Sequence, residues 1–115
     1  MSPGKLKKAD LAHLRAATRA WVEGVRKAFI LEPHHERLLL AAAEQWDRTR
    51  QAVEVLAEDG LVIHDRAGVP KGHPMLRCER ESKILFEKLV RSLGLDLIGD
   101  EDPHRPPTVQ SRRGR

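Results

Sequence analysis

Apolar residues recur at helical spacing in three separate stretches of the chain. In residues 10–29 the steps between apolar positions are mostly three or four, which places these positions on one face of a helix. Residues 33–59 and 74–93 carry further stripes of the same kind. The last of these stripes consists of Ile84, Leu85, Leu89 and Leu93. The pattern predicts three amphipathic helices and a mainly α fold.

Capping and breaking residues mark where these helices begin and end. Asp10 is a suitable N-cap for the first helix. Pro33 separates the first two helices, because proline disfavours helical geometry in the residue before it and suits the first helical position. Gly60 ends the second helix and Gly94 the third, as glycine often does. Pro74 opens the third helix.

The link between the first two predicted helices is only a few residues long. Short links favour antiparallel packing of neighbouring helices. We therefore expect an antiparallel pair of long helices, with Trp21 and Trp46 on facing stripes.

Residues 61–72 change in character and predict a small β-hairpin. Leu61, Val62 and Ile63 favour a strand, and residues 65–68 supply turn chemistry. Pro70 restricts the return strand to an edge position. Because an isolated hairpin is only marginally stable in water, we expect it to pack against the helices or against a neighbouring subunit.

The charge of +4 is distributed unevenly along the 115 residues. Residues 1–9 carry +3, residues 10–99 are neutral, residues 100–102 carry −3 and residues 103–115 carry +4. We interpret the chain as a loose basic N-terminal arm at 1–9, one helical domain at 10–99 and a disordered basic tail at 100–115. Basic ends of this kind often bind a polyanion such as nucleic acid.

The candidate DNA-binding residues lie in the two ends and on one helical stripe. Lysines and arginines in such positions release phosphate counterions and give salt-sensitive, sequence-blind binding. The alternative interpretations are a solvated helix face for the stripe and solubility alone for the ends. The candidates are Lys5, Lys7, Lys8, Arg15, Arg19, Arg26, Arg105, Arg112, Arg113 and Arg115.

No catalytic or metal-binding constellation is recognisable in the sequence, and we predict neither a cofactor nor a metal. Adjacent His34 and His35 point about 100° apart on a helix and do not converge on one ion, so a surface role is expected for them. His64 and His73 flank the hairpin and are expected to be structural. Cys78 is the only cysteine, which excludes an internal disulfide.

Composition excludes further classes. No apolar run approaches the roughly 20 residues of a membrane helix, and no apolar signal segment follows the N-terminal lysines. The four aromatic residues are few for a protein that stacks single-stranded bases. A soluble, cytoplasmic, helical protein is expected.

Three stretches in this order resemble the small subunit of phage terminases, over residues 10–98. The first is TRAWVEGVRKAFILEPHHERLLLAAAEQWDRTRQA, which contains the break at Glu32 and Pro33. The second is LAEDGLVIHDRAGVPKGHP, in which a long helix ends and a hairpin follows. The third is ERESKILFEKLVRSLGLDL, a final helix that ends in a turn containing leucine and glycine.

The resemblance implies a non-enzymatic protein of viral DNA packaging. Such subunits form a homo-oligomeric ring of about eight to twelve chains, closed by cyclic symmetry. They recognise double-stranded viral DNA and present it to the terminase large subunit, which carries the ATPase and the nuclease. The expected location is the host cytoplasm.

Two other functions are weighed against this one. A small helical DNA-binding regulator requires a compact helix-turn-helix, and no short helix pair with a three- to four-residue turn is evident in the sequence. A helical scaffold or adaptor without a nucleic-acid role would show no DNA binding even at low salt.

Overall fold

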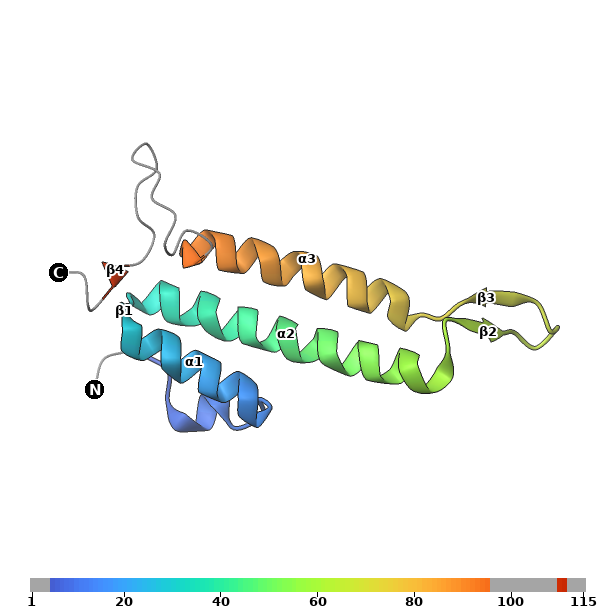
Figure 1. Ribbon diagram of the computed structural model, residues 1–115, viewed down its shortest axis with the longest axis horizontal. Helices are drawn as coiled ribbons and strands as arrows, with labels where there is room; N and C mark the ends of the chain where they lie inside the picture. Colours follow the sequence, from blue (N-terminus) through green and yellow to red (C-terminus); the bar gives the residue numbers. More distant parts are fainter. Residues whose placement is uncertain (1–4, 96–109, 112–115) are drawn as a thin grey trace.

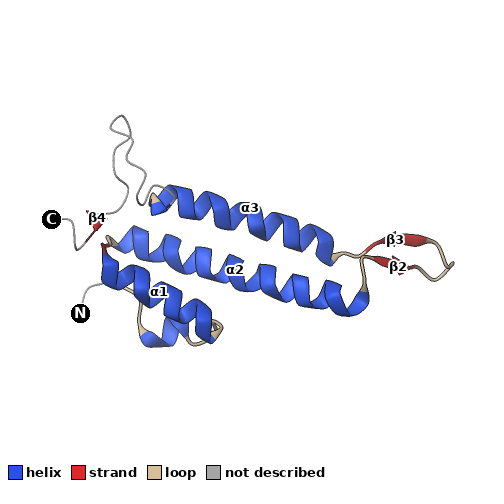
Figure 2. Cartoon of the chain, viewed as in Figure 1, coloured by secondary structure: helices blue, strands red, loops and turns tan. Residues whose placement is uncertain are grey.

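The computed structural model describes residues 5–95 and 110–111, and three helices dominate this part of the chain. They are α1 (Ala16–Ala28), α2 (Pro33–Asp59) and α3 (Met75–Leu93). As Figure 1 shows, α2 runs antiparallel to both α1 and α3, and the three helices lie side by side. Figure 2 shows how little of the chain is strand. The predicted mainly α architecture with a small hairpin is confirmed.

The predicted boundaries of the second and third helices agree closely with the structure. α2 begins at Pro33 and ends at Asp59, and it spans about 40 Å at ~1.5 Å per residue. Gly60 follows it at φ 83°, and Gly94 follows α3 at φ 78°. Glycine adopts these left-handed angles without a Cβ clash. Local chemistry therefore suffices to end both helices.

The prediction of one helix over residues 10–29 with Asp10 as its N-cap is wrong at its start. The segment opens with a short 3₁₀ turn, η1 (Lys8–Leu11), whose Asp10 carboxylate accepts the Lys7 backbone N–H at 2.8 Å. The α-helix begins only at Ala16. Its first turn is capped from outside, because the Asp47 carboxylate of α2 accepts the Arg15 backbone N–H at 2.8 Å.

The core lies where the N-terminal segment, α1, α2 and the end of α3 meet. Its members are Leu11, Leu14, Val22, Val25, Leu31, Leu39, Ala43 and Leu93. The α3 stripe is only partly buried, since Ile84 is 48% and Leu85 45% exposed. Ser82 faces α2 instead, where its hydroxyl lies 2.7 Å from that of Thr49. The main hydrophobic cluster therefore lies at the end of the helices away from the hairpin, while Ala52 and Leu56 of α2 are buried nearer to it.

Trp21 and Trp46 both contact the ring of Phe86, which lies between them. The predicted pairing of the first two helices did not include this ring of α3. The Phe86 ring of α3 lies 5.9 Å from that of Trp21 and 5.3 Å from that of Trp46. These are ordinary separations for tilted aromatic pairs. Together with Ala17 and Thr18, the three rings line a groove of about 340 Å³.

The predicted hairpin is present as β2 (Val62–His64) and β3 (Pro70–Gly72), paired antiparallel with Ile63 opposite Lys71. The Asp65 carboxylate accepts two backbone N–H groups of the turn, from Ala67 and Val69, each at 2.9 Å. Figure 1 shows that the hairpin projects beyond the ends of α2 and α3. Within the described residues, the helices of its own chain therefore leave it largely uncovered.

A second pair of strands joins the link after α1 to the far end of the chain. β1 (Phe29–Ile30) pairs antiparallel with β4 (Gln110–Ser111), with Phe29 opposite Ser111. These two residues fall within the tail predicted at 100–115, and side-chain patterns do not reveal such backbone pairing. The remainder of that tail lies outside the described residues.

Candidate nucleic-acid interface

Each arginine of the predicted basic stripe has partners within the chain, and two of them, Arg15 and Arg26, bond to carboxylates of α2. Arg15 is the clearest case: its guanidinium donates to both carboxylate oxygens of Glu54, at 2.6 and 2.9 Å. This two-point hydrogen bond raises the pKa of Arg15 and lowers the pKa of Glu54. Such fork-to-carboxylate geometry is the strongest that an arginine forms.

Arg19 stabilises the turn that precedes α1. Its guanidinium donates to the backbone carbonyls of Leu14, at 2.5 Å, and of Ala12, at 3.4 Å. These carbonyls belong to the irregular segment between η1 and α1, where no helical N–H reaches them. The side chain therefore replaces regular backbone hydrogen bonds, which is a structural role.

Arg26 is the centre of a partly buried ion-pair network. It contacts Glu36 at 3.2 Å and Glu23 at 2.9 Å, and it donates to the backbone carbonyl of Leu6 at 3.1 Å. Burial opposes its charge, but the hydrogen bonds that it donates to the Glu36 and Glu23 carboxylates, together with their negative charge, outweigh this and raise the pKa of Arg26. Glu36 is itself only 3% exposed and accepts the Leu6 backbone N–H at 2.8 Å.

The carboxylates of α2 that bind α1 and the segment before it form an acidic stripe, which is a further group of functional-site residues not predicted above. They are Glu36, Glu44, Asp47 and Glu54. Their steps of eight, three and seven residues correspond to one helical face, so the signal was present in the sequence. Two carboxylates of the acidic stripe, Glu54 and Glu36, thus form ion pairs with Arg15 and Arg26 of the basic stripe.

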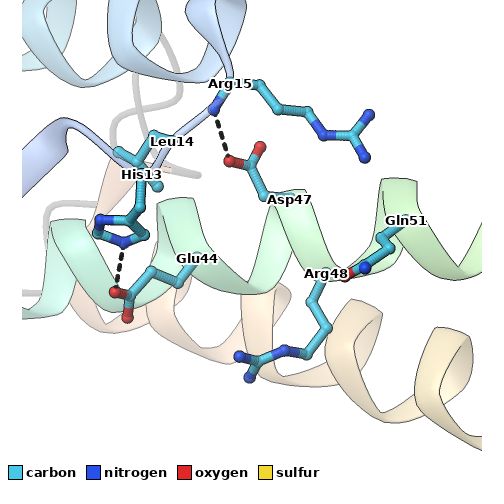
Figure 3. Close-up of a pocket in the computed structure, with 7 residues that line it drawn as sticks. All are labelled: His13, Leu14, Arg15, Glu44, Asp47, Arg48 and Gln51. Carbon is cyan, nitrogen blue, oxygen red and sulfur yellow. Dashed lines mark hydrogen bonds and ion pairs between the residues drawn. The ribbon is translucent and has the colours of Figure 1, made fainter.

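Figure 3 shows the polar pocket where this pairing is densest. The His13 side chain meets Glu44 of α2 there, and the Arg15 backbone N–H bonds to Asp47 while the Arg15 guanidinium extends away from it. The pocket measures about 280 Å³ and holds carboxylates beside the bases. Carboxylates repel phosphate, so this pocket does not provide an anion site. The lining residues are His13, Leu14, Arg15, Glu44, Asp47, Arg48 and Gln51.

The lysines of the predicted N-terminal arm differ from the arginine stripe. The prediction of a loose arm is wrong for residues 5–9, since Leu6 packs against the core and the Lys5 ammonium donates to the Leu31 carbonyl. Lys7 and Lys8 remain exposed, and no ion pair to them is found among the described residues. The predicted site residues Arg105, Arg112, Arg113 and Arg115 lie outside the described residues.

Two of the described histidines, His35 and His73, hold backbone or side-chain groups in place. The expected surface position of His35 is wrong: its side chain is buried and its Nδ1 accepts the Glu32 backbone N–H at 3.0 Å. His73 closes the base of the hairpin, between the Asp59 carboxylate at 2.9 Å and the Met75 backbone N–H at 3.0 Å. The search of the described residues finds no cluster of three or more metal-ligating side chains.

Comparison with family models, with curated proteins and with solved structures finds no match for this chain. No helix within residues 5–95 is long and apolar enough to cross a membrane. The functional argument therefore relies on the geometry of the chain and on the resemblance of its sequence.

Proposed function

We propose that this protein is the small subunit of a phage terminase, which recognises double-stranded viral DNA and presents it to the large ATPase and nuclease subunit in the host cytoplasm. Its role is non-catalytic and needs no cofactor. The observation that carries the proposal is the division of charge. Arg15, Arg19 and Arg26 bond to carboxylates or carbonyls of the body, whereas exposed Lys7 and Lys8 form no ion pair among the described residues.

Assembly into a ring of about eight to twelve copies is the second part of the proposal. The side chains that support it are large, apolar and exposed, and they lie on two different surfaces. Trp46, Ile84 and Leu85 are 42–48% exposed on the helices, while Leu61, Val62 and Val69 are 54–60% exposed around the hairpin. Contacts between unlike surfaces of identical chains propagate head to tail, and they close into a ring when the rotation between neighbours adds up to a full turn. A neighbour that covers the hairpin would supply the stability that it lacks alone.

A small helix-turn-helix regulator is less well supported by this geometry. Such a motif joins two short helices at a steep angle. Here α1 and α2 run antiparallel, and α2 alone has 27 residues. A helical adaptor without a nucleic-acid role differs from the proposed function in one expectation, which is that it does not bind DNA. Binding experiments therefore distinguish the two.

The experiment measures the mass of the full chain by light scattering after chromatography, together with its affinity for a labelled duplex over a series of salt concentrations. We expect the mass of a ring at micromolar protein concentration. We also expect the logarithm of the binding constant to fall with the logarithm of the salt concentration, with a slope of about −0.9 for each phosphate neutralised. The double variant Val62→Ser/Val69→Ser is expected to lower the mass, whereas Ala67→Ser, in the hairpin turn, keeps it. A monomeric wild type refutes the ring, and absent binding at low salt refutes the DNA function.

A further inference from the structure

The pair of helices α2 and α3 has a groove on each of its two sides. The aromatic groove described above lies on the side of α1, and a second groove of about 330 Å³ shares no residue with it. On α2, Gln45 lines the second groove and its neighbour Trp46 lines the aromatic one. On α3, Leu85 and Phe86 are divided in the same way. Because adjacent helical positions point about 100° apart, the two grooves lie on opposite sides of the pair.

The acidic side chains of α2 are directed to the side of α1. The acidic stripe bonds to α1 and to the segment before it. Figure 3 shows the Arg48 side chain directed away from that of Asp47, its neighbour on the helix. Glu44, which lines the polar pocket together with Arg48, bonds to His13 at 2.8 Å instead. One side of the helix therefore uses the carboxylates, and the other keeps basic side chains.

Four basic residues form a stripe along the second groove, which we call the α2–α3 basic stripe. Arg48 of α2 and Arg77 of α3 line the groove itself. Arg37 precedes Arg48 by about three helical turns, and Lys88 follows Leu85 of the groove by about one turn. Both therefore continue the faces that line the groove. All four basic side chains are exposed.

The stripe alternates between the two helices at nearly even intervals. The hydroxyls of Thr49 and Ser82 meet at 2.7 Å and mark the level at which antiparallel α2 and α3 face each other. At a rise of ~1.5 Å per residue, the four basic residues follow one another along the common axis at intervals of roughly 8 to 9 Å. Their order from the hairpin end is Arg77, Arg48, Lys88 and Arg37. The stripe is about 25 Å long, which corresponds to about seven base pairs of a duplex at ~3.4 Å each.

Carboxylates cancel little of this charge. Among the described residues that line the second groove, Glu81 is the one carboxylate, and it bonds to Arg77 at 3.0 Å. The other three bases of the stripe form no ion pair with any described residue. Four bases against one acid leave this side of the pair strongly positive, although the helical domain as a whole is neutral.

We propose that the α2–α3 basic stripe is the surface that holds the phosphate backbone of duplex DNA. This inference rests on the proposed DNA-binding function and places a contact for it on the folded body of the chain. Duplex DNA carries one charge per ~1.7 Å of its axis, so a stripe of this length meets several phosphates at once. Because two regular helices hold the four positions in place, binding requires little ordering of the backbone.

The decisive variant is Arg37→Gln/Arg48→Gln/Lys88→Gln, which removes the three bases without an ion pair and leaves Arg77 with Glu81. We expect it to weaken duplex binding about tenfold and to reduce the salt slope by about three. Its mass by light scattering should equal that of wild type. A glutamine variant that binds duplex like wild type overturns the inference. One that loses mass identifies the stripe as a contact between copies of the chain, which overturns it too.

A charge-matched control tests whether location matters. Lys27→Gln/Arg66→Gln/Lys71→Gln removes as many exposed charges from α1 and the hairpin, and it should change affinity less than about threefold. The charge-preserving variant Arg37→Lys/Arg48→Lys/Lys88→Arg should bind within about twofold of wild type, since phosphate neutralisation depends on charge. A control that loses as much affinity as the glutamine variant contradicts a localised surface.

Cys78 is the only cysteine of the chain and lines the second groove, so it reports on coverage of that groove. We expect saturating duplex to slow the labelling of Cys78 by a maleimide severalfold. In Cys78→Ser/Ala67→Cys the thiol lies in the hairpin turn, and duplex should leave its labelling rate unchanged. Equal labelling of Cys78 with and without duplex overturns the inference.

The two levels of the argument fail in different ways. A wild type that fails to bind duplex DNA at low salt refutes the proposed function and this inference together. A wild type that binds duplex, with a glutamine variant that binds equally well, refutes this inference alone.

Discussion

The two ends of this molecule are built by opposite means. At the link between α1 and α2, buried side chains such as Leu39 and an ion-pair network around Arg26 hold the N-terminal segment, α1 and α2 together. At the hairpin, Val62 and Val69 are more than half exposed, and His73 with Asp59 ties the base. One end buries apolar side chains and pairs a buried charge, whereas the other leaves large apolar side chains exposed.

The same contrast separates charges that stabilise the fold from charges that remain exposed. Arg15, Arg19 and Arg26 lie between elements and bond to carboxylates or carbonyls. Lys7 and Lys8 precede these arginines in the sequence, are exposed, and form no ion pair among the described residues. A count of basic residues therefore overstates the charge that a ligand would meet.

The largest expected difference between the ends concerns burial. Leu39→Ala should lower the free energy of unfolding by about 2–5 kcal/mol, because Leu39 is fully buried and its loss leaves a cavity. Val62→Ala, at a site that is 55% exposed, should change it by less than about 0.5 kcal/mol. Urea unfolding at one fixed protein concentration measures both, since assembly adds to stability. Equal losses would mean that the hairpin end is as well packed as the link.

The next largest effect concerns the ion-pair network. Arg26→Ala should cost about 2–3 kcal/mol, because it leaves the buried Glu36 carboxylate without its ion-pair partner. Adding Glu36→Gln should recover part of that loss, since no buried charge then remains. Arg37→Ala, at an exposed position, is the control and should be nearly neutral. A double variant less stable than Arg26→Ala would contradict a network based on charge pairing.

The smallest effect is a pH dependence at the exposed pair of Arg15 and Glu54. The hydrogen bond from Arg15 lowers the pKa of Glu54, so the stabilisation is present above the ordinary glutamate pKa of about 4.3 and is lost as the pH falls through the lowered value. Glu54→Gln should therefore be less stable than wild type at neutral pH and equal to it in strong acid. Thermal unfolding at several pH values measures this, and a gap that widens in acid would contradict it.

Much of the fold could be predicted because local chemistry decides it. Pro33, Gly60 and Gly94 begin or end helices through backbone geometry alone, and the hairpin turn follows from Asp65 and Gly68. The start of α1 could not be predicted in this way. The backbone N–H of Arg15, the residue before α1, bonds to the carboxylate of Asp47, which lies 32 residues further along the sequence.

The candidate site divides along the same line. The sequence identified the basic residues, but each arginine of the stripe depends on a partner from another element or turn. The acidic stripe of α2 offered a signal, since Glu36, Asp47 and Glu54 share one helical face. Whether these carboxylates form ion pairs depends on which helix faces pack together, and the pattern of residues along the chain does not determine that packing.

By itself, the sequence determined the helices, the hairpin, the absence of a recognisable catalytic motif and the uneven distribution of charge. The tertiary structure alone decided which charged side chains form ion pairs within the chain and which short strands pair with each other. The physical reason is that ion pairs such as Arg26 with Glu36, and strand pairs such as β1 with β4, join residues far apart in sequence. Their formation depends on packing, whereas helix caps and turns depend on neighbouring residues.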